Sequence, residues 1–250
     1  MLRSINGMAA APPLAGAVLA LCLGSGATAQ ARPDPAALQA AERMGTYLQS
    51  LKTFQVTSDV TLGAIEEGQR RELKASASYK VRRPDGFVIE TTGERKARKF
   101  IYDGKSFTVF APKVGYYASV SAPPTIRQTV DVIYDTYGVA LPLADLFYWG
   151  EGASPTGAVT AASKVGQENV GGTPTDHYSY RSADLAWDLW IQRGAQPLPR
   201  KITITTLDDP ARPTYSATLS WDLSPTFAPD TFAFNPAKDA KPIALAKVNP

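Results

Sequence analysis

Apolar residues recur every three or four positions over residues 38–51, which predicts an amphipathic helix in the N-terminal part of the chain. Five apolar positions fall on one face of this helix: Leu38, Ala41, Met44, Leu48 and Leu51. Asp34 and Pro35, directly before the pattern, suit the N-cap and the first helical position. Because only one face is apolar, we expect this helix to lie against another element.

From Thr53 the apolar period changes to two, which is the spacing of strands with one buried face. The first run of such strands extends to Val120, with polar turns at residues 66–69 and 84–86. Asp103-Gly104, between two short apolar stretches, is the strongest hairpin signal in the chain. The pattern therefore predicts consecutive antiparallel strands with one apolar and one solvated face.

A helical period returns in the middle of the chain. The apolar positions of this second helix are Ile126, Val130, Ile133 and Tyr137, and Gly138 follows them. The next segment, Leu141–Trp149, is apolar on nearly all sides, so we expect it to be buried or to cover an apolar opening. Residues 150–157 are predicted to form a loop that divides the chain into unequal halves.

The second half of the chain returns to strand patterns. Gly171-Gly172 separates runs at 163–170 and 173–181, which predicts a second hairpin. Further strands are expected at residues 185–192, 201–205 and 214–223. A short apolar cluster at 230–234 then precedes a polar, Pro-containing tail.

Ten or eleven one-sided strands with two helices predict a mainly β (α+β) fold. Its architecture is expected to be a curled antiparallel sheet, or unclosed β-barrel, with helices covering the concave face. Small and aromatic residues are mixed on that face, and this composition allows either a ligand cavity or a filled core. The candidate cavity residues are Val60, Leu73, Ala77, Tyr79, Phe87, Ile89, Phe107, Val109, Leu146, Trp149, Trp187, Leu189, Leu219 and Trp221.

Residues 1–29 have the pattern of a secretory signal peptide. Arg3 is the only charged residue in them, and the apolar core Ala15–Leu23 is too short to span a bilayer as a helix. Ala27-Thr28-Ala29 offers the small-residue pattern of a cleavage site, so we expect a cut before Gln30.

The expected mature chain consists of one domain at 30–236 and a tail at 237–250. A lipid anchor on Cys22, the only cysteine, is disfavoured because the bulky Leu21 precedes it. No later segment approaches the roughly 18 apolar residues that a membrane helix needs. We therefore expect a protein without a membrane span that works free in the bacterial periplasm.

Charge and residue types exclude several function classes for this mature chain. Its 25 basic and 23 acidic residues are too balanced for a nucleic-acid binder. Without cysteine it has no disulfide, thiolate metal site or thiol nucleophile, and no cofactor is expected. The only histidine, His177, follows Asp176 in a strand, where adjacent side chains point to opposite faces. We therefore interpret it as a surface residue, and the absence of hydrolase and phosphate-loop motifs favours a protein that is not an enzyme.

A group of basic residues offers two interpretations. It is either a solvated hairpin end that discourages edge-to-edge aggregation, or a patch that meets an anionic head group or an acidic protein surface. The candidates for this patch are Arg82, Arg83, Arg95, Lys96, Arg98 and Lys99.

The order of these elements resembles the LolA/LolB lipoprotein-carrier superfamily. The resemblance includes the Tyr102–Lys105 hairpin and the terminal Phe232–Pro236. Tyr178, Trp190–Gly194 and Pro197–Lys201 further resemble an uncharacterised family of predicted periplasmic proteins within this superfamily.

This resemblance implies an unclosed β-barrel whose helices form a lid over an apolar cavity for acyl chains. It favours a non-catalytic protein that binds a hydrophobic ligand, with an acyl lipid or lipoprotein as partner. The alternative is a protein-interaction or sensor module that uses the same fold to bind an envelope protein. An enzyme with scattered carboxylates would need a polar cleft, which the strand pattern does not indicate.

Overall fold

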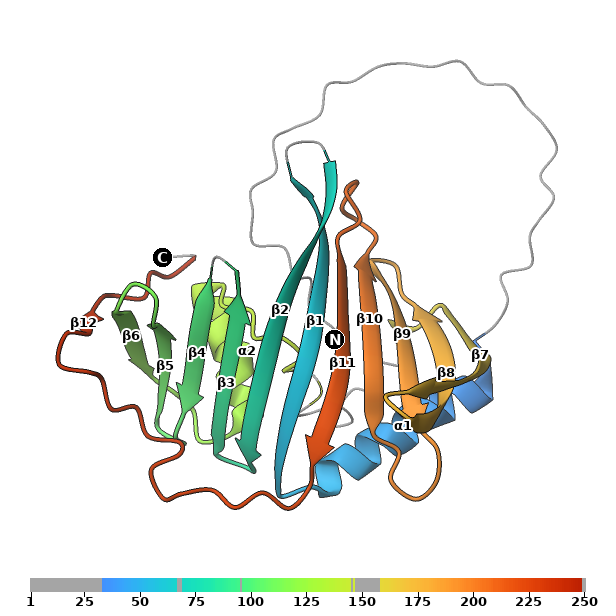
Figure 1. Ribbon diagram of the computed structural model, residues 1–250, viewed down its shortest axis with the longest axis horizontal. Helices are drawn as coiled ribbons and strands as arrows, with labels where there is room; N and C mark the ends of the chain where they lie inside the picture. Colours follow the sequence, from blue (N-terminus) through green and yellow to red (C-terminus); the bar gives the residue numbers. More distant parts are fainter. Residues whose placement is uncertain (1–32, 67–68, 95, 145, 147–157, 249–250) are drawn as a thin grey trace, which may run out of the picture.

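The computed structural model describes residues 33–66, 69–94, 96–144, 146 and 158–248 of the chain (Figure 1). The described part contains two longer helices and twelve strands. The helices are α1 (Pro35–Ser50) and α2 (Ile126–Tyr137). The strands are β1 (Thr53–Glu66), β2 (Gln69–Arg82), β3 (Gly86–Gly93), β4 (Ala97–Tyr102), β5 (Ser106–Ala111), β6 (Tyr116–Ser121), β7 (Ala161–Val170), β8 (Thr173–Arg181), β9 (Leu185–Gln192), β10 (Pro199–Thr206), β11 (Thr214–Asp222) and β12 (Lys241–Pro242).

All twelve strands belong to one sheet, in the order β12-β6-β5-β4-β3-β2-β1-β11-β10-β9-β8-β7. The neighbouring pairs are antiparallel except β12 with β6, which is parallel. The end strands β7 and β12 do not pair with each other, so the sheet stays open (Figure 1). The predicted fold class, a mainly β open antiparallel sheet with covering helices, is confirmed.

The sheet has a concave face, defined here as the face whose side chains share the main core with α1 and α2. In α1 the buried residues are Ala37, Ala40, Ala41, Met44, Gly45 and Leu48, close to the predicted apolar face. Asp34 caps the helix by accepting the backbone N–H of Ala36 at 2.9 Å. Helix α2 ends at Gly138, whose φ of +65° suits glycine at a helix C-terminus.

Both predicted hairpin turns are present. Asp103 accepts the backbone N–H groups of Lys105 and Ser106 at 2.9 and 2.7 Å, which closes the turn between β4 and β5. Gly171 and Gly172, between β7 and β8, have φ values of +56° and +80°. Two successive positive φ values are the geometry of the type I′ turn that favours this dipeptide.

The C-terminal segment after β11 runs past the lower ends of the strands and reaches the opposite edge of the sheet (Figure 1). Phe232 packs there against Val88 and Ile101, as the predicted apolar cluster at 230–234 requires. β12, which lies in the tail at 237–250, then pairs with β6. Neither of the longer described helices meets the length and hydropathy of a membrane span.

Candidate functional site

Most of the candidate cavity residues lie on the concave face and are packed into the core. Ten of the fourteen are less than 10% exposed: Val60, Ala77, Tyr79, Phe87, Ile89, Phe107, Leu146, Trp187, Leu189 and Leu219. Leu73, Val109 and Trp221 are half-buried, and Trp149 lies outside the described residues. The structure therefore brings these residues onto one face, and it fills most of that face with helices and side chains.

Small residues and two tyrosines are buried together on the concave face. Ala77 and Ala217 are 6% and 0% exposed, and the rings of Tyr79 and Tyr215 are buried on the same face. The two phenols interact with each other. Burial raises the pKa of Tyr79 to about 12, although its interactions with Tyr215 and Ser58 lower it in part. Burial likewise raises the pKa of Tyr215, so both phenols stay neutral at physiological pH.

Three half-buried apolar side chains adjoin one another on strands β1 and β2 of the concave face. These residues, Leu62, Leu73 and Ala75, are called the apolar strip below. Leu62 pairs with Leu73 across β1 and β2, and Ala75 follows Leu73 on the same face of β2. These side chains retain solvent contact where their neighbours nearer to α1 and α2 have none. The strip is the part of the concave face where an apolar ligand has the least protein to displace.

The predicted covering segment Leu141–Trp149 is only partly described. Leu143, Ala144 and Leu146 are 8%, 3% and 5% exposed and belong to the main core. These three residues therefore lie buried in the core, one of the two predicted outcomes, while Leu141 and Pro142 are half-buried.

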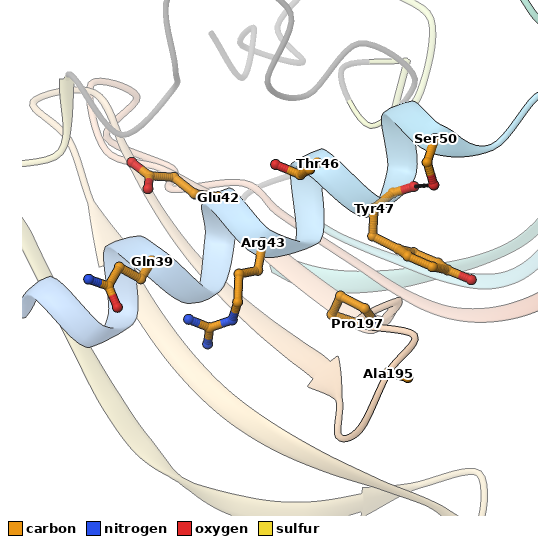
Figure 2. Close-up of a pocket in the computed structure, with 8 residues that line it drawn as sticks. All are labelled: Gln39, Glu42, Arg43, Thr46, Tyr47, Ser50, Ala195 and Pro197. Atoms are coloured by element: carbon orange, nitrogen blue, oxygen red, sulfur yellow. Dashed lines mark hydrogen bonds between the residues drawn. The ribbon is translucent and has the colours of Figure 1, made fainter.

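A groove of about 670 Å³ lies outside the core, between the outer face of α1 and the loop that joins β9 to β10 (Figure 2). Its walls are Gln39, Glu42, Arg43, Thr46, Tyr47, Ser50, Ala195 and Pro197. In Figure 2 the side chains of Arg43 and Tyr47 extend toward the side of the helix on which Ala195 and Pro197 lie. The sequence did not indicate this groove, because the polar face of a helix carries no signal for a loop that follows 150 residues later.

The structure separates the candidate basic residues. Arg82 is the last residue of β2 and Arg83 follows it, and both are engaged in structural contacts. Arg82 contacts Asp85 at 3.2 Å and lies over the ring of Phe232 at 4.6 Å. Arg83 donates to the carbonyl oxygen of Leu48, at the C-terminus of α1, at 3.4 Å. These contacts give both arginines a structural role within the protein.

Lys96, Arg98 and Lys99 lie at the opposite end of the strands, and Arg95 is outside the described residues. Lys99 contacts Glu90 at 2.8 Å, across β4 and β3. Arg98, one residue earlier, points to the concave face. The six residues therefore do not form one patch in the described structure.

His177 is more enclosed than the sequence suggested. As expected, Asp176 faces away from it and contacts Lys164 at 2.9 Å. The imidazole is 12% exposed and lies between Glu168 and Asp188, at 3.0 and 3.1 Å. It also stacks on Trp190 with ring centroids 4.0 Å apart. The interpretation as a plain surface residue is therefore corrected, because neighbouring strands supply partners that sequence adjacency cannot reveal.

The architecture and the site define a class of protein: a half-barrel of antiparallel strands with helices over an apolar concave face. The chain belongs to the family described as predicted periplasmic protein (DUF2092), whose model matches residues 37–246. The predicted membership of an uncharacterised periplasmic family is thus confirmed. The signal peptide expected at residues 1–29 lies outside the described residues.

Several solved structures are similar at low identity. LprF from Mycobacterium bovis is 17% identical over 81% of this chain and 100% of its own, with a TM-score of 0.46. The lipoprotein LppX from Mycobacterium tuberculosis is 11% identical over 78% and 98%, with a TM-score of 0.40. A LolA superfamily protein from Nitrosomonas europaea is 12% identical over 79% and 97%, with a TM-score of 0.35. No curated protein matches the sequence significantly. Similarities at this level carry no functional argument.

Proposed function

We propose that this protein is a non-catalytic periplasmic protein that binds an acyl lipid or another hydrophobic ligand on the concave face of its sheet. The observation that carries the proposal is the half-buried apolar strip, which adjoins a large apolar core on the same face. An acyl chain that lies on this strip loses contact with water, which stabilises the complex by roughly 0.8 kcal/mol for each buried methylene. The resemblance of the sequence to lipoprotein carriers supports the same ligand class.

The burial of the neighbouring candidate residues suggests how a longer chain would be accommodated. The first carbons would lie on the apolar strip, and the remaining ones would require the buried side chains of Leu143, Ala144 and Leu146 to move outward. Such a movement exposes few backbone hydrogen bonds of the sheet, since these three residues are not part of it. The proposed ligand is therefore held between the sheet and a movable cover.

The test is native mass spectrometry, with lipid extraction, of the protein purified from a periplasm. We expect co-purified acyl lipid in the unmodified protein and its loss in Leu73→Asp, because a carboxylate on the apolar strip opposes an apolar ligand. Val165→Asp is the matched control, since Val165 is 56% exposed on the edge strand β7. A protein that repeatedly contains no lipid would contradict the proposal.

The groove beside α1 favours a second candidate function, the binding of an envelope protein. Its walls combine the charges of Glu42 and Arg43 with the ring of Tyr47, a mixture typical of protein contacts. A photocrosslinking residue at Thr46 should then form a specific adduct in whole cells. The same residue at Ser76, exposed on the sheet, is the control. Equal labelling from both positions would exclude a site in the groove.

A further inference from the structure

Arg98 differs from the other basic candidates in the face to which it points. On β4 it pairs with Thr91 of β3, two residues from the pair Ile89–Phe100, which belongs to the main core. Residues two apart in a strand share a face, so the register places Arg98 on the concave face. Lys99 points to the convex face, where it contacts Glu90.

The residues that neighbour Arg98 on this face have small side chains. Thr91, its partner on β3, pairs in turn with Ala77 of β2. Next along the same strands, Gly93 pairs with Ala75 of the apolar strip. The large side chains that fill the core therefore begin only farther along β3 and β4.

Around Arg98, the described charges of the concave face are of one sign. Among the described side chains of β1–β6, the register places only two charged ones on the concave face, Arg71 and Arg98. The guanidinium of Arg98 is partly buried and donates to the carbonyl oxygen of Ala97 at 2.8 Å. Within the described part of the chain it contacts no carboxylate. A partly buried cation without a counter-charge is unfavourable, and a bound anion removes that cost.

We infer that Arg98 binds the anionic head, a carboxylate or phosphate, of an acyl ligand whose chain lies on the apolar strip. This inference rests on the proposed function and narrows its ligand class to anionic amphiphiles. The planar guanidinium offers two parallel N–H groups, which match the two oxygens of either anion. Arg71, farther out on β2, adds a second positive charge that attracts the same head group before it docks.

The test uses the protein purified from a periplasm and the neutral fluorescent probe N-phenyl-1-naphthylamine. Dodecyl phosphate and dodecanol share one chain length and differ in head group, so their displacement of the probe isolates the contribution of the anion. We expect dodecyl phosphate to bind about tenfold more tightly than dodecanol, which corresponds to one charge-assisted contact. Arg98→Gln should abolish this preference while leaving dodecanol binding unchanged.

Lys99→Gln is the matched control, because it removes the same charge one residue away on the opposite face. Equal affinity of the two amphiphiles for the unmodified protein would overturn the inference and leave the proposed function intact. Equal losses in the two variants would overturn it as well, since they would indicate general charge attraction. Competition by inorganic phosphate alone would assign the site to a free anion instead. Failure of all amphiphiles to displace the probe would contradict the proposed function itself.

Discussion

At the scale of single residues, Asp103 shows how one side chain stabilises a turn. Its carboxylate accepts three hydrogen bonds, from the backbone of Lys105 and from the backbone and hydroxyl of Ser106. Burial by itself would raise the pKa of Asp103, but these hydrogen bonds outweigh burial and lower it. The next residue, Gly104, has a φ of +91°, and a Cβ there would lie 3.2 Å from the backbone oxygen of Asp85.

Asp103→Ala should therefore destabilise the protein by about 1 kcal/mol at neutral pH. Because the folded pKa is lowered, the contribution is fully present above the unfolded value of about 3.9 and disappears as the pH falls through the folded value. Urea unfolding at pH 7 and at low pH measures the difference. Asp103→Asn keeps one acceptor oxygen and should lose less. An equal effect of Asp103→Ala at both pH values would contradict this explanation.

Tyr79 should lose its contribution to stability at high pH, whereas Asp103 loses its contribution at low pH. Its pKa is raised to about 12 by burial, so the folded state holds the phenol proton more tightly than the unfolded state. The stability that this provides is complete below about pH 10 and is lost as the pH approaches 12. In Tyr79→Phe we expect a loss of about 1 kcal/mol at neutral pH and a weaker decline of stability above pH 10. Unfolding curves across this range, with phenolate absorbance as a second readout, test it.

At the scale of elements, the strands and helices follow the hydrophobic pattern closely. The predicted strand at 173–181 matches β8 and the one at 185–192 matches β9. These elements were predictable because every strand buries one face, so alternation appears directly in the sequence. β12 was not predictable, because two residues that include a proline carry no periodicity and become a strand only beside β6.

The C-terminal segment fastens the sheet through one aromatic residue. Phe232 is 4% exposed and packs on Val88 and Ile101 of the convex face. We expect Phe232→Ala to lower the free energy of unfolding by about 3 kcal/mol, the usual cost of a large-to-small change at a buried site. Val114→Ala, at a site that is 63% exposed, should change it by less than about 0.5 kcal/mol. Similar effects of the two substitutions in urea unfolding would show that the segment is not fastened there.

At the scale of the whole molecule, a ligand on the concave face must couple to folding. Since the apolar strip exists only in the folded sheet, an acyl ligand at a hundred times its dissociation constant should add about 2.7 kcal/mol to the free energy of unfolding. Thermal unfolding with and without dodecyl phosphate measures this shift. Leu73→Asp should remove most of the shift, whereas Val165→Asp should retain it. A shift of the same size in both variants would place the ligand away from the strip.

The sequence by itself determined the main helices and strands, the open sheet that they form and the alternation of two faces along each strand. These features depend on periodicity and turn chemistry, which act between residues close in the chain. The tertiary structure alone decided which parts of the concave face are filled. Tyr79 and Tyr215 interact in the core because β1 pairs with both of their strands, β2 and β11, which are far apart in the sequence.

The same distinction holds for the charged residues. The sequence presents Arg82, Arg83, Arg98 and Lys99 as one basic group, yet pairing and register distribute them over two ends and two faces of the sheet. Only long-range strand pairing decides which side chain meets a partner and which faces the apolar strip, because a shift of one residue reverses the face of a strand residue. For Arg98, this pairing decides between two roles: a solvated surface charge, or a candidate site for an anionic head group.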